Sequence, residues 1–113
     1  ICTNPDLVVD RGEIQEYCAG TIAKIFEEMG GEVIYSGKPH KQIYSMIIQE
    51  NEKILIIGDN LRTDIKGANL IEQDSLFILD GVHKNEIRES KNLNSVLEKY
   101  NVKTNFTQKQ LNW

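Results

Sequence analysis

The apolar residues of the chain follow two alternating patterns, short continuous runs and longer stretches with helical spacing. Short runs predict strands at residues 7–9, 33–35, 54–57 and 76–79. Apolar residues three and four positions apart predict helices near residues 22–29, 43–48, 65–70 and 93–100. Strands separated by helices require crossover connections, so the pattern predicts an α/β fold with a parallel sheet. Residues 104–113 are polar and aperiodic, which indicates an irregular tail.

The run at residues 54–57 has no polar position, which is typical of a strand covered on both faces of a parallel sheet. Gly58 and Asp59 follow it, and ligands of open α/β sheets bind at this carboxyl end. Asp64 comes five positions later, at the start of the next helical pattern. It has two interpretations, a helix cap or one ligand of a shared cation such as Mg²⁺. Taken alone, Asp64 favours the cap.

A lysine stands in the segment Ser-Gly-Lys-Pro-His at residues 36–40. Gly37 is flexible and Pro39 suits the first turn of a following helix, so Lys38 is predicted at the mouth of the sheet. An ammonium group there can neutralise a phosphate or several carboxylates. An isolated Gly-Lys-Pro would indicate a solvated surface lysine. Here a helix, a buried strand and then Asp59 follow in order, which favours the site.

Composition limits the possible functions. The chain has 113 residues, 40% of them hydrophobic, which is enough for about one domain with an ordinary core. Its net charge is −4. Its basic residues are scattered, so nucleic acid and an acidic membrane surface are not expected partners, and no apolar stretch is long enough for a membrane span. Cys2 and Cys18 are expected to be buried thiols in a reducing, cytoplasmic compartment. His40 and His83 are expected at loop surfaces.

Five segments together resemble the haloacid dehalogenase-like (HAD) hydrolases, and most closely the class IIA subgroup of p-nitrophenylphosphatase-like and N-acetylglucosamine-phosphate phosphatase-like enzymes. They are CTNPD (residues 2–6), CAGTIAKIFEEMGGE (18–32), GKPH (37–40), IGDNLRTDIKGAN (57–69) and SLFILDGVH (75–83). The resemblance implies a Rossmann-like parallel sheet. It makes residues 1–36 the end of an α/β cap and residues 37–113 the C-terminal half of the catalytic core.

The resemblance also implies roles for four side chains. The family's third motif would place Lys38 beside the transferring phosphoryl group. Its fourth motif, GDxxxxD, would make Asp59 a ligand of Mg²⁺, with Asp64 and Asn60 holding the metal or its waters. Mg²⁺ keeps several waters and needs few carboxylates, which suits this small set.

Asn4 and Asp6, in the cap-like part, are candidates for contacting the leaving group of a small phosphorylated metabolite. The alternative for residues 4–6 is a simple turn, because Asn, Pro and Asp are common turn residues. The two alternatives stand about even.

The family's first motif, DxDxT, supplies the aspartyl nucleophile, and it does not occur in this sequence. The chain also begins without Met, so a fragment is expected. Two hypotheses follow. The chain is the C-terminal part of a Mg²⁺-dependent phosphatase that needs a complementary N-terminal chain or self-association, or it is a non-catalytic remnant that acts as a binding module. A receiver or dinucleotide-binding domain is disfavoured, because neither an early acidic pair nor GxGxxG is present.

Overall fold

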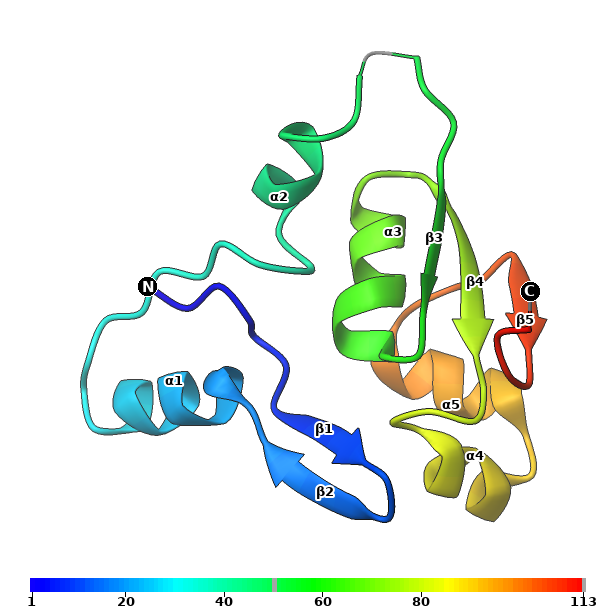
Figure 1. The fold of residues 1–113 in the computed structure, drawn as a ribbon, viewed down its shortest axis with the longest axis horizontal. Coiled ribbons are helices and arrows are strands. Elements are labelled where there is room, and N and C mark those ends of the chain that lie inside the picture. The colour runs from blue at the N-terminus through cyan, green and yellow to red at the C-terminus, as the bar shows by residue number, and fades with distance from the viewer. Residues whose placement is uncertain (50, 113) are drawn as a thin grey trace.

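The computed structural model describes residues 1–49 and 51–112. Near the N-terminus, β1 (Val8–Arg11) and β2 (Ile14–Tyr17) form an antiparallel hairpin. Gly12 lies in the turn between them with a φ of +66°, a conformation that glycine adopts without strain. Helix α1 (Ala19–Glu28) follows the hairpin directly. The hairpin and α1 lie toward the end of the main sheet where β3 and β4 finish (Figure 1).

The main sheet has three parallel strands in the order β3–β4–β5. They are β3 (Leu55–Gly58), β4 (Asp74–Ile78) and β5 (Phe106–Gln108). A π-helical turn, η1 (Leu61–Ile65), and α3 (Lys66–Leu70) connect β3 to β4, while α4 (Lys84–Ser90) and α5 (Leu93–Tyr100) connect β4 to β5. A short helix, α2 (Lys41–Ser45), precedes β3. This arrangement confirms the predicted α/β class.

The hydrophobic core lies around the central strand, β4. Phe77 of β4 and Leu61 and Ile65 of η1 are fully buried, and Val96 of α5 and Val102 complete the buried cluster. The core therefore fixes η1, the segment that follows Asp59, against the sheet. Burying a side chain such as Phe77 contributes roughly 1.5–3 kcal/mol.

Strand β3 is less covered than the sequence predicted. Leu55 is 47% exposed and Ile57 is 40% exposed, so the prediction of a strand buried on both faces is wrong for this chain. The reason is that one face of β3 is left largely uncovered: Leu55 and Ile57 point to the same face, whereas Ile56 on the other face is half-buried. Strand β3 is also an edge of the sheet, and among the described residues its ladder partner is β4 alone. Its second edge carries backbone groups available for pairing with another strand.

Other predicted elements differ from those observed. Residues 33–35 form no strand; only Tyr35 takes part, in an isolated bridge with Cys2. The tail predicted as irregular contains β5, and the apolar pattern predicted neither α4 nor β2. The helix expected at 43–48 is α2, which is shorter and begins earlier. Strand β5 lacks apolar alternation and α4 has a single apolar residue, Ile87, so neither leaves a periodic signal.

The division at residue 36 stays a prediction. Residues 1–36 contain β1, β2 and α1, and these strands form no ladder with the main sheet. Four large apolar side chains of this part, Ile22, Ile25, Phe26 and Met29, are more than half exposed along α1 and at its C-terminal end. No helix within the described part of the chain is long and apolar enough to cross a membrane.

Candidate functional site

Asp59 occupies the predicted position, directly after Gly58 at the carboxyl end of β3. Its Oδ2 accepts a hydrogen bond from the backbone N–H of Val82, at 3.0 Å. Val82 follows β4, so the connection after the neighbouring strand orients the carboxylate. The side chain is thus held at the edge of the sheet where ligands of α/β proteins bind.

Lys38 and Asp64 form an ion pair although 26 residues separate them: Lys38 Nζ lies 2.6 Å from Asp64 Oδ1. Asp64 is 7% exposed, and its Oδ2 accepts the backbone N–H of Asn60 at 3.2 Å. The carboxylate therefore binds the lysine and also accepts a backbone donor at the start of η1. The second contact is the capping role predicted for Asp64, and its role as a metal ligand stays a prediction.

The turn that carries Lys38 is anchored from the N-terminal segment. Gly37 is buried, and a Cβ at this position would lie 2.1 Å from the carbonyl oxygen of Thr3, so only glycine fits. Pro39 is part of the same turn, and α2 begins two residues later at Lys41, so the prediction that Pro39 lies in the first helical turn is wrong.

The charge of Lys38 is stabilised by its surroundings. Partial burial lowers the pKa of its ammonium group, but the hydrogen bond and charge of Asp64 and the charge of Asp6 outweigh it and raise the pKa above its usual value. Lys38 is consequently a cation at neutral pH, as a group that neutralises a phosphoryl oxygen must be.

Asp6, from the N-terminal segment, binds the same loop. Its Oδ1 accepts hydrogen bonds from Asn60 Nδ2 at 2.9 Å and from Thr63 Oγ1 at 2.7 Å. Asn60 Oδ1 accepts the backbone N–H of Arg62 at 2.9 Å, so Asn60 acts as the N-cap of η1. Both ends of the Asn60 amide are therefore engaged in bracing the loop.

Asn4 makes the local contact expected of a turn. Its Oδ1 accepts the backbone N–H of Asp6 at 3.2 Å, and the residue is exposed. The structure thus brings Lys38, Asp59, Asp64, Asn60 and Asp6 into one neighbourhood and leaves Asn4 at its margin.

The donor set fits part of a Mg²⁺ site. The carboxylates of Asp59 and Asp64 are the hard oxygen ligands that this ion prefers. Within the described residues, however, no cluster of three or more His, Cys, Asp or Glu side chains could hold a metal. A complete site would therefore require further ligands besides these two carboxylates. Water and phosphate oxygens are ligands that Mg²⁺ commonly takes in addition to one or two carboxylates.

His83 was missed as a contributor to this region. The sequence placed it at a loop surface, but it is 4% exposed, and the backbone N–H of Leu61 donates to its Nε2 at 3.2 Å. The prediction is wrong because α4, which follows His83, was not recognised, and α4 and α5 enclose the ring. The only available signal was a histidine directly after Gly81-Val82, shortly beyond the apolar run of β4.

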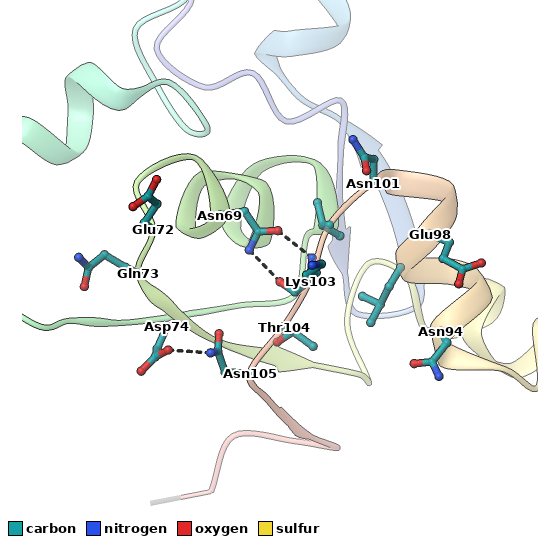
Figure 2. Close-up of a pocket in the computed structure, with 12 residues that line it drawn as sticks. Asn69, Glu72, Gln73, Asp74, Asn94, Glu98, Asn101, Lys103, Thr104 and Asn105 are labelled. Atoms are coloured by element: carbon teal, nitrogen blue, oxygen red, sulfur yellow. Dashed lines mark hydrogen bonds between the residues drawn. The ribbon is translucent and has the colours of Figure 1, made fainter.

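A surface pocket of about 830 Å³ lies elsewhere, at the opposite end of the sheet, beside the start of β4 (Figure 2). Some of its polar groups bind one another: the Asn69 amide pairs with the backbone N–H and C=O of Lys103, and Asn105 donates to Asp74. The pocket contains none of the predicted site residues. The opposite charges of Lys38 and Asp64, which meet beside Asp59, mark the better candidate site.

Comparisons with known proteins agree with the motifs. Residues 35–104 match a family model described as HAD-hydrolase-like. The chain is 34% identical over 86 residues to ribonucleotide monophosphatase NagD of Escherichia coli K12, covering 73% of this chain and 34% of that protein. The chain therefore spans about a third of the length of this curated relative.

Solved structures share the fold. A haloacid dehalogenase-like hydrolase from Brucella suis is 39% identical with a TM-score of 0.64, over 71% of this chain and 33% of that one. A possible sugar phosphatase of the HAD superfamily from Cytophaga hutchinsonii has a TM-score of 0.69 at 24% identity, over 93% of this chain and 39% of that one. The latter likeness concerns the fold alone.

Proposed function

Because the chain belongs to the HAD-hydrolase-like family, we propose that it is the C-terminal part of a Mg²⁺-dependent phosphatase that hydrolyses small phosphomonoesters such as sugar phosphates. One observation carries the proposal. The Lys38–Asp64 ion pair, 2.6 Å long, joins the lysine to the loop that begins with Asp59, as a site for a phosphoryl group and a cation requires. A cytoplasmic location is part of the same proposal, supported by the two free cysteines.

The roles follow from charge and position. Lys38 binds a phosphoryl oxygen and offsets its negative charge. Asp59 and Asp64 hold Mg²⁺, which when bound supplies positive charge to the phosphoryl oxygens. Asn60 holds the loop. Its Oδ1 is the atom that could bind the metal, and this oxygen already accepts a hydrogen bond from the Arg62 N–H. The aspartyl nucleophile comes from the DxDxT motif, which lies outside this sequence.

Contacts with the leaving group are proposed for the cap-like segment. Asn4 is exposed and near the site, which supports this role. Asp6 is a weaker candidate because its Oδ1 is occupied by Asn60 and Thr63. Only its second oxygen remains for a substrate.

Calorimetric titration tests the metal assignment. The chain should bind Mg²⁺ weakly, because one carboxylate of the full ligand set is missing, and Asp59→Asn should weaken binding further. Glu32→Gln, a change of an exposed acid, is the matched control. Micromolar affinity that survives Asp59→Asn would contradict the assignment of Asp59.

Activity assays test the reaction. With p-nitrophenyl phosphate and Mg²⁺, the 113-residue chain should hydrolyse no faster than buffer does. A chain joined or mixed with the DxDxT-containing half should be active, and Lys38→Ala should abolish this activity while Lys41→Ala, a change of an exposed lysine in α2, should not. Turnover by the isolated chain, purified free of host phosphatases, would show that the chemistry is misplaced.

The alternative function is a non-catalytic binding module, and the absence of DxDxT from the sequence favours it. Reading the frame upstream of Ile1, and searching the same genome for a separate chain with DxDxT, separates the two functions. If no such half exists and no mixture is active, the binding module is the better assignment.

A further inference from the structure

Residues Gly81 to His83, in the connection between β4 and α4, contact Asp59 and the loop that follows it at two points. The Val82 N–H donates to Asp59 Oδ2 at 3.0 Å, and His83 Nε2 accepts the Leu61 N–H at 3.2 Å. Asp59 and Leu61 flank Asn60. Two neighbouring residues thus hold the loop on both sides of its N-cap.

Gly81 permits this close approach. A Cβ at this position would lie 2.1 Å from Asp59 Oδ2 and 2.3 Å from Asp59 Cβ, so a larger residue would displace the carboxylate. The backbone of the segment therefore packs directly against the side chain of Asp59.

The contacts of His83 determine its tautomer. Leu61 N–H is a donor, so Nε2 must be unprotonated, and the ring proton is on Nδ1. Nδ1 lies 3.0 Å from Glu86 Oε2, which accepts this proton. Glu86 is in turn hydrogen-bonded by Lys99 and by the Tyr100 hydroxyl.

These partners keep Glu86 ionised. Burial raises the pKa of Glu86, but hydrogen bonds from Lys99, His83 and Tyr100 prevail and lower it to about 2. The ring of Tyr100 also packs edge-on against His83, with 4.8 Å between the ring centroids. Residues of α4 and α5 thus orient the imidazole from the side away from the loop.

We propose that His83 is a positioning residue: by accepting the Leu61 N–H from a ring oriented by Glu86, it holds the loop of residues 59–64 so that Asp59 and Asp64 keep their spacing. The role assigned to the two acids rests on the proposed function, but the contact itself does not. A histidine that only filled the core would not need its Nε2 directed at this backbone donor. Without that acceptor, a buried N–H is left unsatisfied.

Two substitutions separate the acceptor from the ring. His83→Phe keeps an aromatic ring against Tyr100 but has no acceptor, whereas His83→Gln keeps an acceptor near the position of Nε2. In hydrogen exchange of the chain without metal, His83→Phe should lower the protection of the Leu61 amide at least about tenfold, and the Phe77 amide in β4 should change less. His83→Gln should restore much of the protection at Leu61.

Nitrogen NMR of the wild-type imidazole gives a result that needs no variant, in case His83→Phe does not fold. A proton on Nδ1 and an unprotonated Nε2 are expected at neutral pH. A proton on Nε2, or unchanged Leu61 protection in His83→Phe, would overturn the proposal.

The consequence for the site is measured in the active, complemented protein. His83→Phe should raise the Mg²⁺ concentration needed for half-maximal activity and lower kcat more than it changes KM, and His83→Gln should recover both. Equal effects of the two variants would refute the positioning role. If no complemented protein is active, the proposed function fails. The exchange and NMR results still decide whether His83 Nε2 accepts the Leu61 N–H.

Discussion

Replacing Asp6 by alanine tests how the N-terminal segment is joined to the candidate site. In the structure, one carboxylate oxygen of Asp6 accepts hydrogen bonds from Asn60 Nδ2 at 2.9 Å and from Thr63 Oγ1 at 2.7 Å. Asn60 is 7% exposed and Thr63 is 3% exposed, so both donors would lose their partner in a nearly dry environment. Each unsatisfied donor costs about 1–3 kcal/mol.

The expected loss of unfolding free energy in Asp6→Ala is about 2–4 kcal/mol, below the sum for two donors, because Asp6 is itself partly exposed and water that replaces its carboxylate recovers some of the cost. Asp6→Asn retains an acceptor oxygen and should lose about 1 kcal/mol. A domain is stable by roughly 5–15 kcal/mol, so the first change is a large fraction of the total.

Urea unfolding followed by circular dichroism measures both variants. Asp74→Ala is the matched control, because Asp74 also accepts an amide hydrogen bond, from Asn105, but on an exposed surface, where about 0–1 kcal/mol is expected. Equal midpoints for Asp6→Ala and Asp74→Ala would refute the bracing role of Asp6. Such a result would also mean that the hydrogen bonds of Asp6 do not join residues 1–36 to the loop.

Three further predictions concern other parts of the chain. The free edge of β3 should drive self-association or pairing with a complementary chain, so a dilute monomer in ultracentrifugation with strongly protected amides at residues 54–57 would contradict it. The depressed pKa of Glu86, about 2 against 4.5, should contribute stability that is complete above about pH 5 and is lost as pH falls toward 2. Because Glu86 is partly exposed, this contribution should be about 1–2 kcal/mol, and acid titration of unfolding in Glu86→Gln should show a flatter profile. Tyr44→Phe should keep or raise stability in thermal unfolding, since the Tyr44 hydroxyl is buried and has no hydrogen-bond partner among the described residues. A loss of unfolding free energy above about 1 kcal/mol would contradict this and would mean that the hydroxyl makes a hydrogen bond.

The separation between local and long-range information is clear at the candidate site. Lys38, Asp59 and Asp64 were predictable because each stands in a short motif whose order along the chain reflects the order of elements in an α/β fold. The helices α1 and α5 were predictable because their apolar spacing is regular, and the family was indicated by the same motifs and is confirmed by the match over residues 35–104.

Other features depend on contacts between distant residues. Nothing near Asp6 in the sequence indicates that its carboxylate binds Asn60 and Thr63, which are 54 and 57 residues away. The burial of His83 depends on α4 and α5 closing over it, and strand β5 exists because its backbone pairs with β4 although its side chains are mostly exposed.

The exposure of β3 gives the clearest physical reason for the difference. An apolar run indicates that a strand is more stable when buried, because removing apolar surface from water is favourable. Whether it is buried depends on which elements cover its two faces, and in this chain the face that carries Leu55 and Ile57 is left largely uncovered. The sequence by itself determined the motifs, the elements with strong periodicity and the family. The tertiary structure alone decided which side chains meet, which strand remains open and how the loop after Asp59 is held.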